Sequence, residues 1–331
     1  MHLPKFTYYR LSSRAEAGRL LKEHGSHALL VAGGTDLYPR MKYCLVQPEI
    51  VISLKDLAVK NPEVDASGTL HLDPLMTMAA VASSSIIKEK FPILAQAAHS
   101  TASGQVRNMA TLGGNICLEN RCLYYNQSHT FQFVEPCFKR AGNHCYLSPQ
   151  GKKCLAVFVA DTVPALIALR TSLTLTDGEK VRSLPLENLY TGDALQPLCL
   201  EVGEQVADVL IPAAGAPAGM AFKKFSLRGG MEFAAFNLAA VLKLDSGHRT
   251  CTGVRLAVGA ISQAPLRLAR AEASLMGRQA SPALFAEIAN IATSEVSPLP
   301  HHGYSSSYLK ECLGVYIRRT LGAAFTTIVT K

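Results

Sequence analysis

Four cysteines, Cys122, Cys137, Cys145 and Cys154, lie between residues 120 and 156. Thiolates are soft ligands that suit zinc and iron–sulfur clusters. Zinc ribbons usually present paired Cys-x2-4-Cys knuckles, and such pairs are absent here. The spacings of 14, 7 and 8 intervening residues better suit a loop around a [4Fe–4S] cluster, which needs one thiolate per iron. Zinc and purely structural thiols stay open as alternatives.

The other possible ligands rank below these four. Cys117 is the nearest further cysteine, and His129 and His144 lie within or beside the same spacing. The remaining cysteines are scattered in apolar surroundings, which is typical of buried structural thiols: Cys44, Cys199, Cys251 and Cys312.

Two glycine-bearing turns could hold a phosphate. Gly33-Gly34 ends the run Leu29-Leu30-Val31-Ala32 and precedes Thr35-Asp36, and Gly113-Gly114 stands in Thr111-Leu112-Gly113-Gly114-Asn115. Adjacent glycines let backbone N–H groups approach a pyrophosphate closely. The spacing is not Gly-x-Gly-x-x-Gly, so each turn alone has an ordinary structural reading. Two such turns about 80 residues apart fit one extended cofactor held between two subdomains.

An acidic residue supplies a third motif. Asp161 precedes the apolar segment Thr162–Leu166. By itself this pattern is also typical of an aspartate that caps a helix.

The elements that must position these residues can be read from the pattern. We expect a helix over 13–25, strands over 28–31 and 49–54, and a helix starting at 37, which form a small α/β unit. Asp177-Gly178 predicts a hairpin between strands near 173–175 and 180–181, and a last strand follows at 206–211. The Pro-, Ala- and Gly-rich stretch 212–219 predicts a linker. Strands at 220–226, 239–244 and 253–261 and helices at 266–275, 282–291 and 305–320 then predict an α+β domain.

Composition narrows the class of protein. The 331 residues are 48% hydrophobic and 18% charged, as in ordinary globular proteins. The N-terminus lacks a signal-peptide pattern and no apolar run reaches about 18 residues, so we expect a cytoplasmic protein without a membrane span. In that reducing compartment clustered cysteines favour metal binding over disulfides. The net charge of +8 is dispersed, so we expect no nucleic-acid partner, although it suits an acidic electron carrier.

Together and in order, the motifs resemble the FAD-binding medium subunit of the xanthine oxidase family of molybdenum enzymes. The two glycine turns match that family's FAD pyrophosphate loops, the Asp161 segment matches its acidic FAD-contacting segment, and Phe222–Phe225 matches the strand that brings a lysine toward the flavin. The resemblance implies FAD contacts from Leu29, Leu30, Val31, Ala32, Gly33, Gly34, Thr35, Asp36, Thr101, Thr111, Gly114, Asn115, Asp161 and Lys224.

The resemblance also implies a fold. We expect an α+β chain with a two-subdomain FAD-binding (PCMH/vanillyl-alcohol-oxidase-like) domain and a smaller C-terminal α+β domain of the CO dehydrogenase flavoprotein type. The expected boundaries are 1–60 and 61–211 for the two subdomains, 212–219 for the linker and 220–331 for the last domain, with a [4Fe–4S] loop inserted at 120–156.

The cysteine-bearing insertion makes the resemblance more specific. Residues 121–128 resemble the β subunit of 4-hydroxybenzoyl-CoA reductase around the first ligand of its extra [4Fe–4S] cluster. That likeness implies Cys122, Cys137, Cys145 and Cys154 as cluster ligands and Tyr124 as a residue against the flavin.

The implied function is electron transfer without substrate chemistry on this chain. In the family a large subunit carries molybdopterin and a small one carries [2Fe–2S] clusters, assembled with the medium subunit as a dimer of heterotrimers. For the reductase, electrons from a ferredoxin-like carrier would remove the hydroxyl group of 4-hydroxybenzoyl-CoA. Two alternatives stay open: the FAD subunit of another family hydroxylase acting on an N-heterocycle or aldehyde, and a zinc-stabilised, non-catalytic binding protein.

Overall fold

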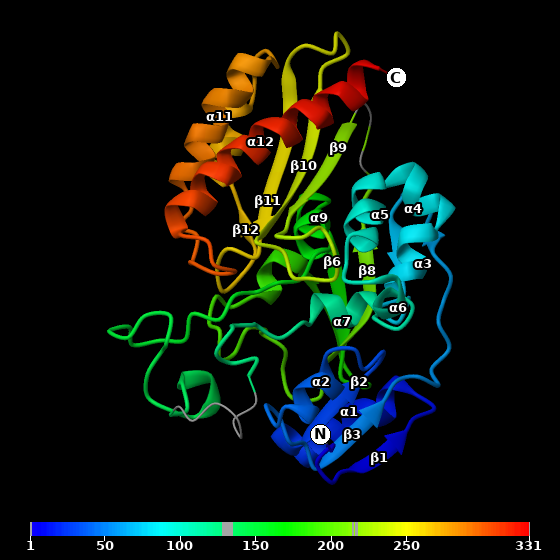
Figure 1. Cartoon of the computed structure of the whole chain (residues 1–331). Helices are drawn as coiled ribbons and strands as arrows, with labels where there is room; N and C mark the ends of the chain where they lie inside the picture. The colour runs from blue at the N-terminus through cyan, green and yellow to red at the C-terminus, as the bar shows by residue number, and fades with distance from the viewer. Residues whose placement is uncertain (1, 128–134, 214, 216–217, 331) are drawn as a thin grey trace.

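The computed structural model of the chain describes residues 2–127, 135–213, 215 and 218–330. Within these ranges three sheets follow one another along the chain and are joined by helices and long loops (Figure 1). Among the helices so described, none combines the length and apolar character needed to cross a membrane. His129 lies outside the described residues.

The first sheet is parallel, with strand order β1-β3-β2. The expected strands are present as β2 (Ala28–Val31) and β3 (Ile50–Ser53), flanked by α1 (Arg14–His24), η1 (Gly25–His27) and α2 (Leu37–Lys42). Ser13 caps α1 by accepting the Glu16 N–H, and Gly25 ends the helix at φ 52°. The additional strand β1 (Thr7–Arg10) is exposed along its length, so it carries no apolar pattern that would have predicted it.

The second sheet has the order β4-β5-β8-β6-β7 and is antiparallel throughout. Its strands are β4 (Glu63–Val64), β5 (Leu70–Leu72), β6 (Ser172–Thr176), β7 (Val181–Pro185) and β8 (Gln205–Ile211). The expected hairpin joins β6 to β7, and Gly178 supplies the positive φ of 96° in its turn. η3 (Leu186–Leu189) follows β7.

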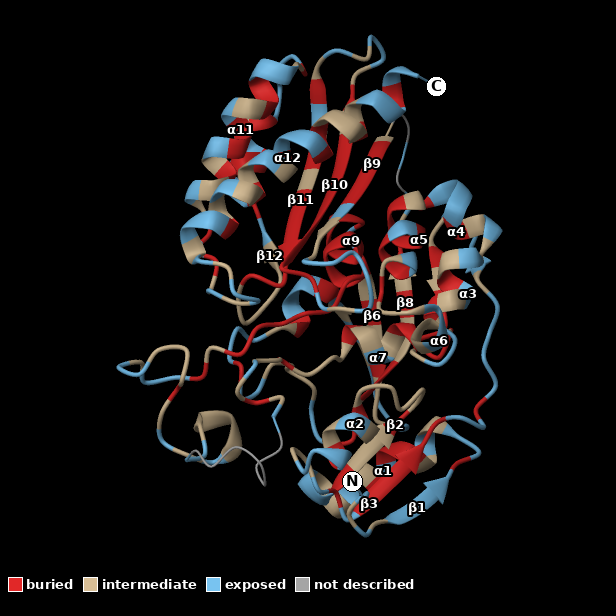
Figure 2. Cartoon of the chain, in the orientation of Figure 1, coloured by how far each residue is buried: buried red, intermediate tan, exposed pale blue. Residues whose placement is uncertain are grey.

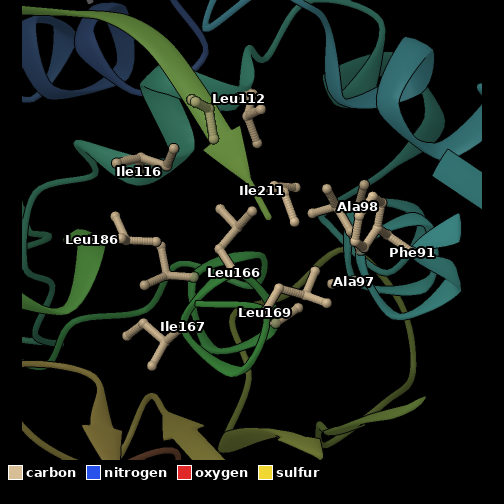
Figure 3. Close-up of a cluster of buried hydrophobic side chains, with 14 of the residues drawn as sticks. Phe91, Ala97, Ala98, Leu112, Ile116, Leu166, Ile167, Leu169, Leu186 and Ile211 are labelled. Atoms are coloured by element: carbon tan, nitrogen blue, oxygen red, sulfur yellow. The ribbon is translucent and has the colours of Figure 1, made fainter. Parts of the chain in front are cut away.

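Helices between β5 and β6 cover this sheet: α3 (Met78–Ser83), α4 (Ser85–Lys90), α5 (Pro92–His99), α6 (Gly104–Arg107), α7 (Leu112–Ile116) and α9 (Val163–Ala168). Gly113-Gly114, expected as a turn, lies inside α7 because Thr111 caps a short helix there. Leu112 and Ile116 anchor α7 in the buried cluster that also holds Leu166 of α9 and Ile211 of β8 (Figure 3).

Between α7 and α9 the chain makes a long excursion that extends away from the sheets (Figure 1). In its described part, η2 (Phe138–Arg140) is a single turn of 3₁₀ helix. The four cysteines lie in this segment.

The third sheet is antiparallel with the order β12-β11-β10-β9. Its strands are β9 (Ala218–Phe225), β10 (Phe236–Leu244), β11 (Cys251–Gly259) and β12 (Leu266–Arg267), followed by α10 (Ala269–Leu275), α11 (Pro282–Ser294) and α12 (Ser306–Val329). α12 packs on β9 and β10, while α5 and α9 contact the sheet as well, which buries most of β10 and β11 (Figure 2).

Several element boundaries differ from expectation in this region: α12 extends to Val329 beyond the expected end at 320, and β10 begins at Phe236 before the expected start at 239. Leu266–Arg267 pairs with β11 as a strand instead of starting a helix, and β9 begins at Ala218, inside the expected linker. Gly219 is buried, and a Cβ there would lie 1.9 Å from the Ala324 carbonyl oxygen of α12. The close packing of the strand on α12 extends β9 into the stretch whose composition suggested a linker.

Candidate functional site

The structure gathers the glycine-bearing segments around one cavity of about 770 Å³. This volume is within the range of small-molecule and cofactor sites. The cavity lies between the unit that contains the first sheet and the unit that contains the second sheet with its helices, because residues of both units line it. The predicted residues that line it are Leu29, Leu30, Val31, Ala32, Gly33, Gly34, Thr35, Asp36, Thr101, Thr111, Gly114, Asn115 and Asp161.

The two glycine segments are held against each other by backbone contact. A Cβ on Gly33 would lie 1.8 Å from the carbonyl oxygen of Met109, just before the second segment. Gly34 has φ 70°, and a Cβ there would also meet the Tyr38 ring at 2.4 Å. Glycine is therefore required at both positions by space and conformation. Both glycine segments thereby reach the wall of the same cavity, which fits the phosphates of an extended cofactor.

Hydrogen bonds connect the second segment to the acidic motif. The Thr111 hydroxyl accepts the Gly114 N–H at 3.1 Å. The side-chain oxygen of Asn115 accepts from the Thr162 hydroxyl at 2.5 Å and from its N–H at 3.2 Å. Thr162, and not Asp161, occupies the N-cap position of α9. The simple capping interpretation of Asp161 is thus wrong.

Asp161 instead forms a buried ion pair at the cavity wall. Lys224 Nζ lies 2.8 Å from its carboxylate and also donates to the carbonyl oxygens of Ser100 and Glu232, each at 3.0 Å. The Asn237 amide donates to Asp161 at 3.1 Å. Burial raises the pKa of Asp161, and the charge and hydrogen bonds of Lys224 and Asn237 oppose that rise. Among the described lining residues Lys224 is not found, so Lys224 contacts the cavity through Asp161.

Several cavity residues had no signal in the sequence. Arg14 of α1 donates to the Val206 carbonyl at 3.2 Å and so ties the first unit to β8. Arg40, Glu119 and Phe233 also line the cavity. The Nε of Arg40 is a buried donor without a partner within the described residues, which fits an anionic ligand there. None of these residues belongs to a short motif, and each reaches the cavity through the tertiary fold.

The four predicted ligands line a second, much smaller pocket, of about 10 Å³: Cys122, Cys137, Cys145 and Cys154. Cys145 and Cys154 are buried, Cys122 and Cys137 are half-buried, and all four are free thiols. Burial raises the pKa of Cys122, and the neighbouring Cys137 and Cys145 add to the rise. The donor set is right in type and number for an iron–sulfur cluster.

The spacing of these thiols is not that of a bound ion. No three His, Cys, Asp or Glu side chains in the described ranges are grouped as ligands of one metal ion. A cubane cluster holds its four thiolates on four different irons, so its ligands stand farther apart than those of one ion. A cluster in this pocket would require the loop to open around it.

Tyr124, assigned by the closer likeness, and the lower-ranked ligands Cys117 and His144 lie in different pockets. Tyr124 lines the cysteine pocket, where its ring stacks on Tyr146 at a centroid distance of 5.0 Å, and it is absent from the described lining of the large cavity. His144 also lines the cysteine pocket, whereas Cys117 lines the large cavity. Burial raises the pKa of Cys117 to about 12, so it stays a neutral thiol.

The scattered cysteines were expected to be buried, and only one is. Cys251 is buried, Cys199 and Cys312 are half-buried, and Cys44 is exposed. Cys44 has φ 54° in the turn after α2, which directs it to solvent. The prediction from apolar neighbours was wrong for Cys44 because a local turn decides its exposure.

Known proteins share both parts of this architecture. Residues 4–214 match the family described as the FAD binding domain in molybdopterin dehydrogenase, and residues 220–324 match the CO dehydrogenase flavoprotein C-terminal domain. The aldehyde oxidoreductase FAD-binding subunit PaoB of Escherichia coli is 28% identical over 83% of this chain and 87% of that protein. The carbon monoxide dehydrogenase medium chain of Hydrogenophaga pseudoflava is 25% identical over 97% of this chain and 98% of its own length.

Solved structures agree with the fold. A carbon monoxide dehydrogenase structure from Hydrogenophaga pseudoflava, which lacks the Mo-pyranopterin moiety of its cofactor, superimposes with a TM-score of 0.80 at 26% identity. The superposition covers 98% of this chain and 99% of that one. The expected fold class, an FAD-binding domain followed by a flavoprotein C-terminal domain, is confirmed.

Proposed function

The chain belongs to the family of FAD-binding domains of molybdopterin dehydrogenases, and from that premise we propose that it carries both FAD and a [4Fe–4S] cluster for electron transfer. FAD exchanges one or two electrons and the cluster exchanges single electrons, so together they suit a relay. Relatives that are medium chains of molybdenum enzymes are oxidoreductase subunits, and this chain is one as well.

The FAD part of the proposal rests on the large cavity. The segments around Gly33 and Gly114 would hold the phosphates, while Asp161, fixed by Lys224, would stand at the wall near Phe233. These residues bind and orient the cofactor. We propose that substrate chemistry takes place on a partner chain and not in this cavity.

The cluster part rests on one observation: four free cysteines that are separated in the sequence line one pocket. This pocket begins only three residues after the last residue of the preceding segment that lines the FAD cavity. Glu119 lines the large cavity and Cys122 lines the cysteine pocket. Cys122, Cys137, Cys145 and Cys154 would hold the cluster. Zinc would provide no electron transfer beside a flavin.

We further propose that the chain works with a molybdopterin-binding large subunit and a [2Fe–2S] small subunit, as a dimer of heterotrimers. The relatives that support this are the medium chain of a carbon monoxide dehydrogenase and the FAD-binding subunit of an aldehyde oxidoreductase. A ferredoxin-like protein would exchange electrons with the cluster, and the compartment would be the cytoplasm.

For the overall reaction we propose reductive dehydroxylation of 4-hydroxybenzoyl-CoA to benzoyl-CoA, because the cysteine insertion resembles that enzyme's β subunit. The second candidate is oxidation of an aldehyde or N-heterocycle, favoured by the aldehyde oxidoreductase relative. The anaerobically purified complex should convert 4-hydroxybenzoyl-CoA with a reduced ferredoxin. Turnover confined to an aldehyde or N-heterocycle with an oxidant would replace the first candidate by the second.

A further inference from the structure

A chain of ion pairs runs from the FAD cavity to the cysteine pocket. Arg121, the residue before Cys122, pairs with Asp36 of the first glycine segment. Arg40 lies 3.7 Å from Asp36 and 3.4 Å from Glu119, and Lys139 lies 2.7 Å from Glu119. We call this set the ion-pair bridge: Asp36, Arg40, Glu119, Arg121 and Lys139.

The bridge belongs to both sites. Asp36, Arg40 and Glu119 line the large cavity, and Lys139 lines the cysteine pocket. Lys139 also donates to the Ala194 carbonyl. Arg121 is held from the other side by backbone pairing with Val157, at the far end of the cysteine segment. The cysteine segment is therefore connected to the cavity wall by charges as well as by the chain.

The bridge is partly buried: the side chains of Arg40, Glu119 and Asp36 are 13%, 23% and 27% exposed. The side chains of Arg121 and Lys139 are 10% and 6% exposed. Removing one partner of such a pair leaves an uncompensated charge in a poorly solvated place. Three cations face two carboxylates, so one positive charge remains formally unmatched. The Nε atoms of Arg40 and Arg121 have no partner within the described residues. The surplus charge suits the diphosphate of FAD.

The position of Asp36 makes Arg121 important for the cavity. Asp36 follows the glycines that would approach the diphosphate, and two like charges in a low-dielectric site repel strongly. Arg121 neutralises this carboxylate, although Arg121 itself is not among the described cavity-lining residues. A residue of the cysteine segment thus controls the electrostatics of the flavin loop.

We propose that the ion-pair bridge couples the two sites, with Arg121 as its positioning residue. FAD binds tightly only when the cysteine segment is seated, and bound FAD in turn seats the cysteine segment, since coupling between two sites is reciprocal. The coupling rests on the proposed function for the identity of FAD, and it does not require that the cysteines hold a cluster.

The test measures FAD affinity of the full chain after chelation of any metal, by flavin fluorescence. Arg121→Gln should weaken FAD binding about tenfold, within the usual range of coupling between sites, and Arg121→Lys should retain most of the affinity. Arg140→Gln is the matched control, because Arg140 lies in the same segment and its side chain donates to the Gln127 carbonyl. Equal affinity for Arg121→Gln and Arg140→Gln overturns the coupling.

The double variant separates charge neutralisation from a merely structural role. In Asp36→Asn with Arg121→Gln the carboxylate that Arg121 no longer neutralises is gone, so FAD affinity should recover relative to Arg121→Gln. A further loss of FAD affinity in the double variant would contradict the proposal. Such a loss is expected if the two side chains have independent structural roles, because independent effects add.

A second readout uses the wild-type chain alone, so it holds even if Arg121→Gln fails to fold. FAD should slow the labelling of the four pocket thiols by a maleimide severalfold, and equal labelling with and without FAD overturns the coupling. A wild-type chain that binds no FAD at all sinks the proposed function together with the coupling. A chain that binds FAD but no iron sinks the cluster alone.

Discussion

Residue 33 must be glycine because it packs directly against the backbone of another segment. Its missing side chain is what allows the first glycine segment to approach Met109, which precedes the second segment. The sequence could predict a phosphate-binding turn at Gly33-Gly34, but not its contact with Met109, because residues 76 positions apart carry no shared pattern.

Replacement of this glycine tests the cavity wall. Gly33→Ala places a Cβ 1.8 Å from a carbonyl oxygen, so the two segments must separate. We expect a loss of about 1–3 kcal/mol in the free energy of unfolding and a low FAD content. Gly104→Ala is the control, because its Cβ would meet nothing closer than 4.0 Å. Retention of full FAD content by Gly33→Ala would contradict the assigned wall.

The lysine at position 224 has contacts that the family likeness did not predict. The family likeness placed it toward the flavin, and the structure places its Nζ on Asp161 and on two carbonyl oxygens. One carbonyl belongs to Glu232, whose neighbours Met231 and Phe233 line the cavity. Lys224 therefore orders the wall around the cofactor site.

Lys224→Met should be strongly destabilising because it leaves Asp161 buried and unpaired. We expect a loss of about 3–5 kcal/mol, measured by urea unfolding with FAD removed. Lys223→Met, at the exposed neighbouring position on β9, should unfold like the wild type. Similar losses for both variants would show that the ion pair does not stabilise this part of the fold.

At the scale of elements, strands and helices with a clear apolar pattern were predicted correctly. Elements that depend on tertiary contacts were missed. The strands around Leu30 and Ile52 were predicted because their residues are apolar. β1 and β12 were missed because their stability comes from pairing with β3 and β11, which no local pattern records. The short helix α7 was predicted as a turn because two adjacent glycines disfavour helix, and the cap from Thr111 and the packing of Leu112 and Ile116 override that preference.

The second sheet carries a titrating contact between strands. His71 of β5 lies 2.7 Å from Asp208 of β8 and 3.2 Å from Asp65. The hydrogen bond to Asp208 raises the pKa of His71, with a further contribution from Asp65. A raised pKa in the folded state means that the protonated histidine stabilises the fold.

The sign of this effect sets the expected pH dependence. The stabilisation by His71 is fully present below its unfolded pKa, about 6.5, and is lost as the pH rises through the folded pKa. His71→Gln should thus cost up to about 1 kcal/mol at pH 6, since the pair is partly exposed to solvent, and less at pH 9. Thermal unfolding at both values checks this, with the exposed His2→Gln as control. A cost that grows with pH would reverse the assignment.

At the scale of the whole molecule, the flavin site and the cysteine pocket are neighbours in one subunit. The sequence predicted the four pocket cysteines and those cavity residues that lie in the glycine segments and the Asp161 motif, which are a minority of the cavity lining. The sequence could not predict the ion-pair bridge, because Arg121 and Asp36 are 85 residues apart and no local sequence pattern indicates the partner of a single arginine.

The presence of a cluster beside the flavin is the central claim, and cofactor analysis tests it most directly. The wild-type chain, purified without oxygen, should contain about four iron and four sulfide per FAD. Cys145→Ser should lose most of the iron and keep FAD, whereas Cys44→Ser, at an exposed site outside the pocket, should match the wild type. Stoichiometric FAD with no iron, or with a single zinc ion, would contradict the claim.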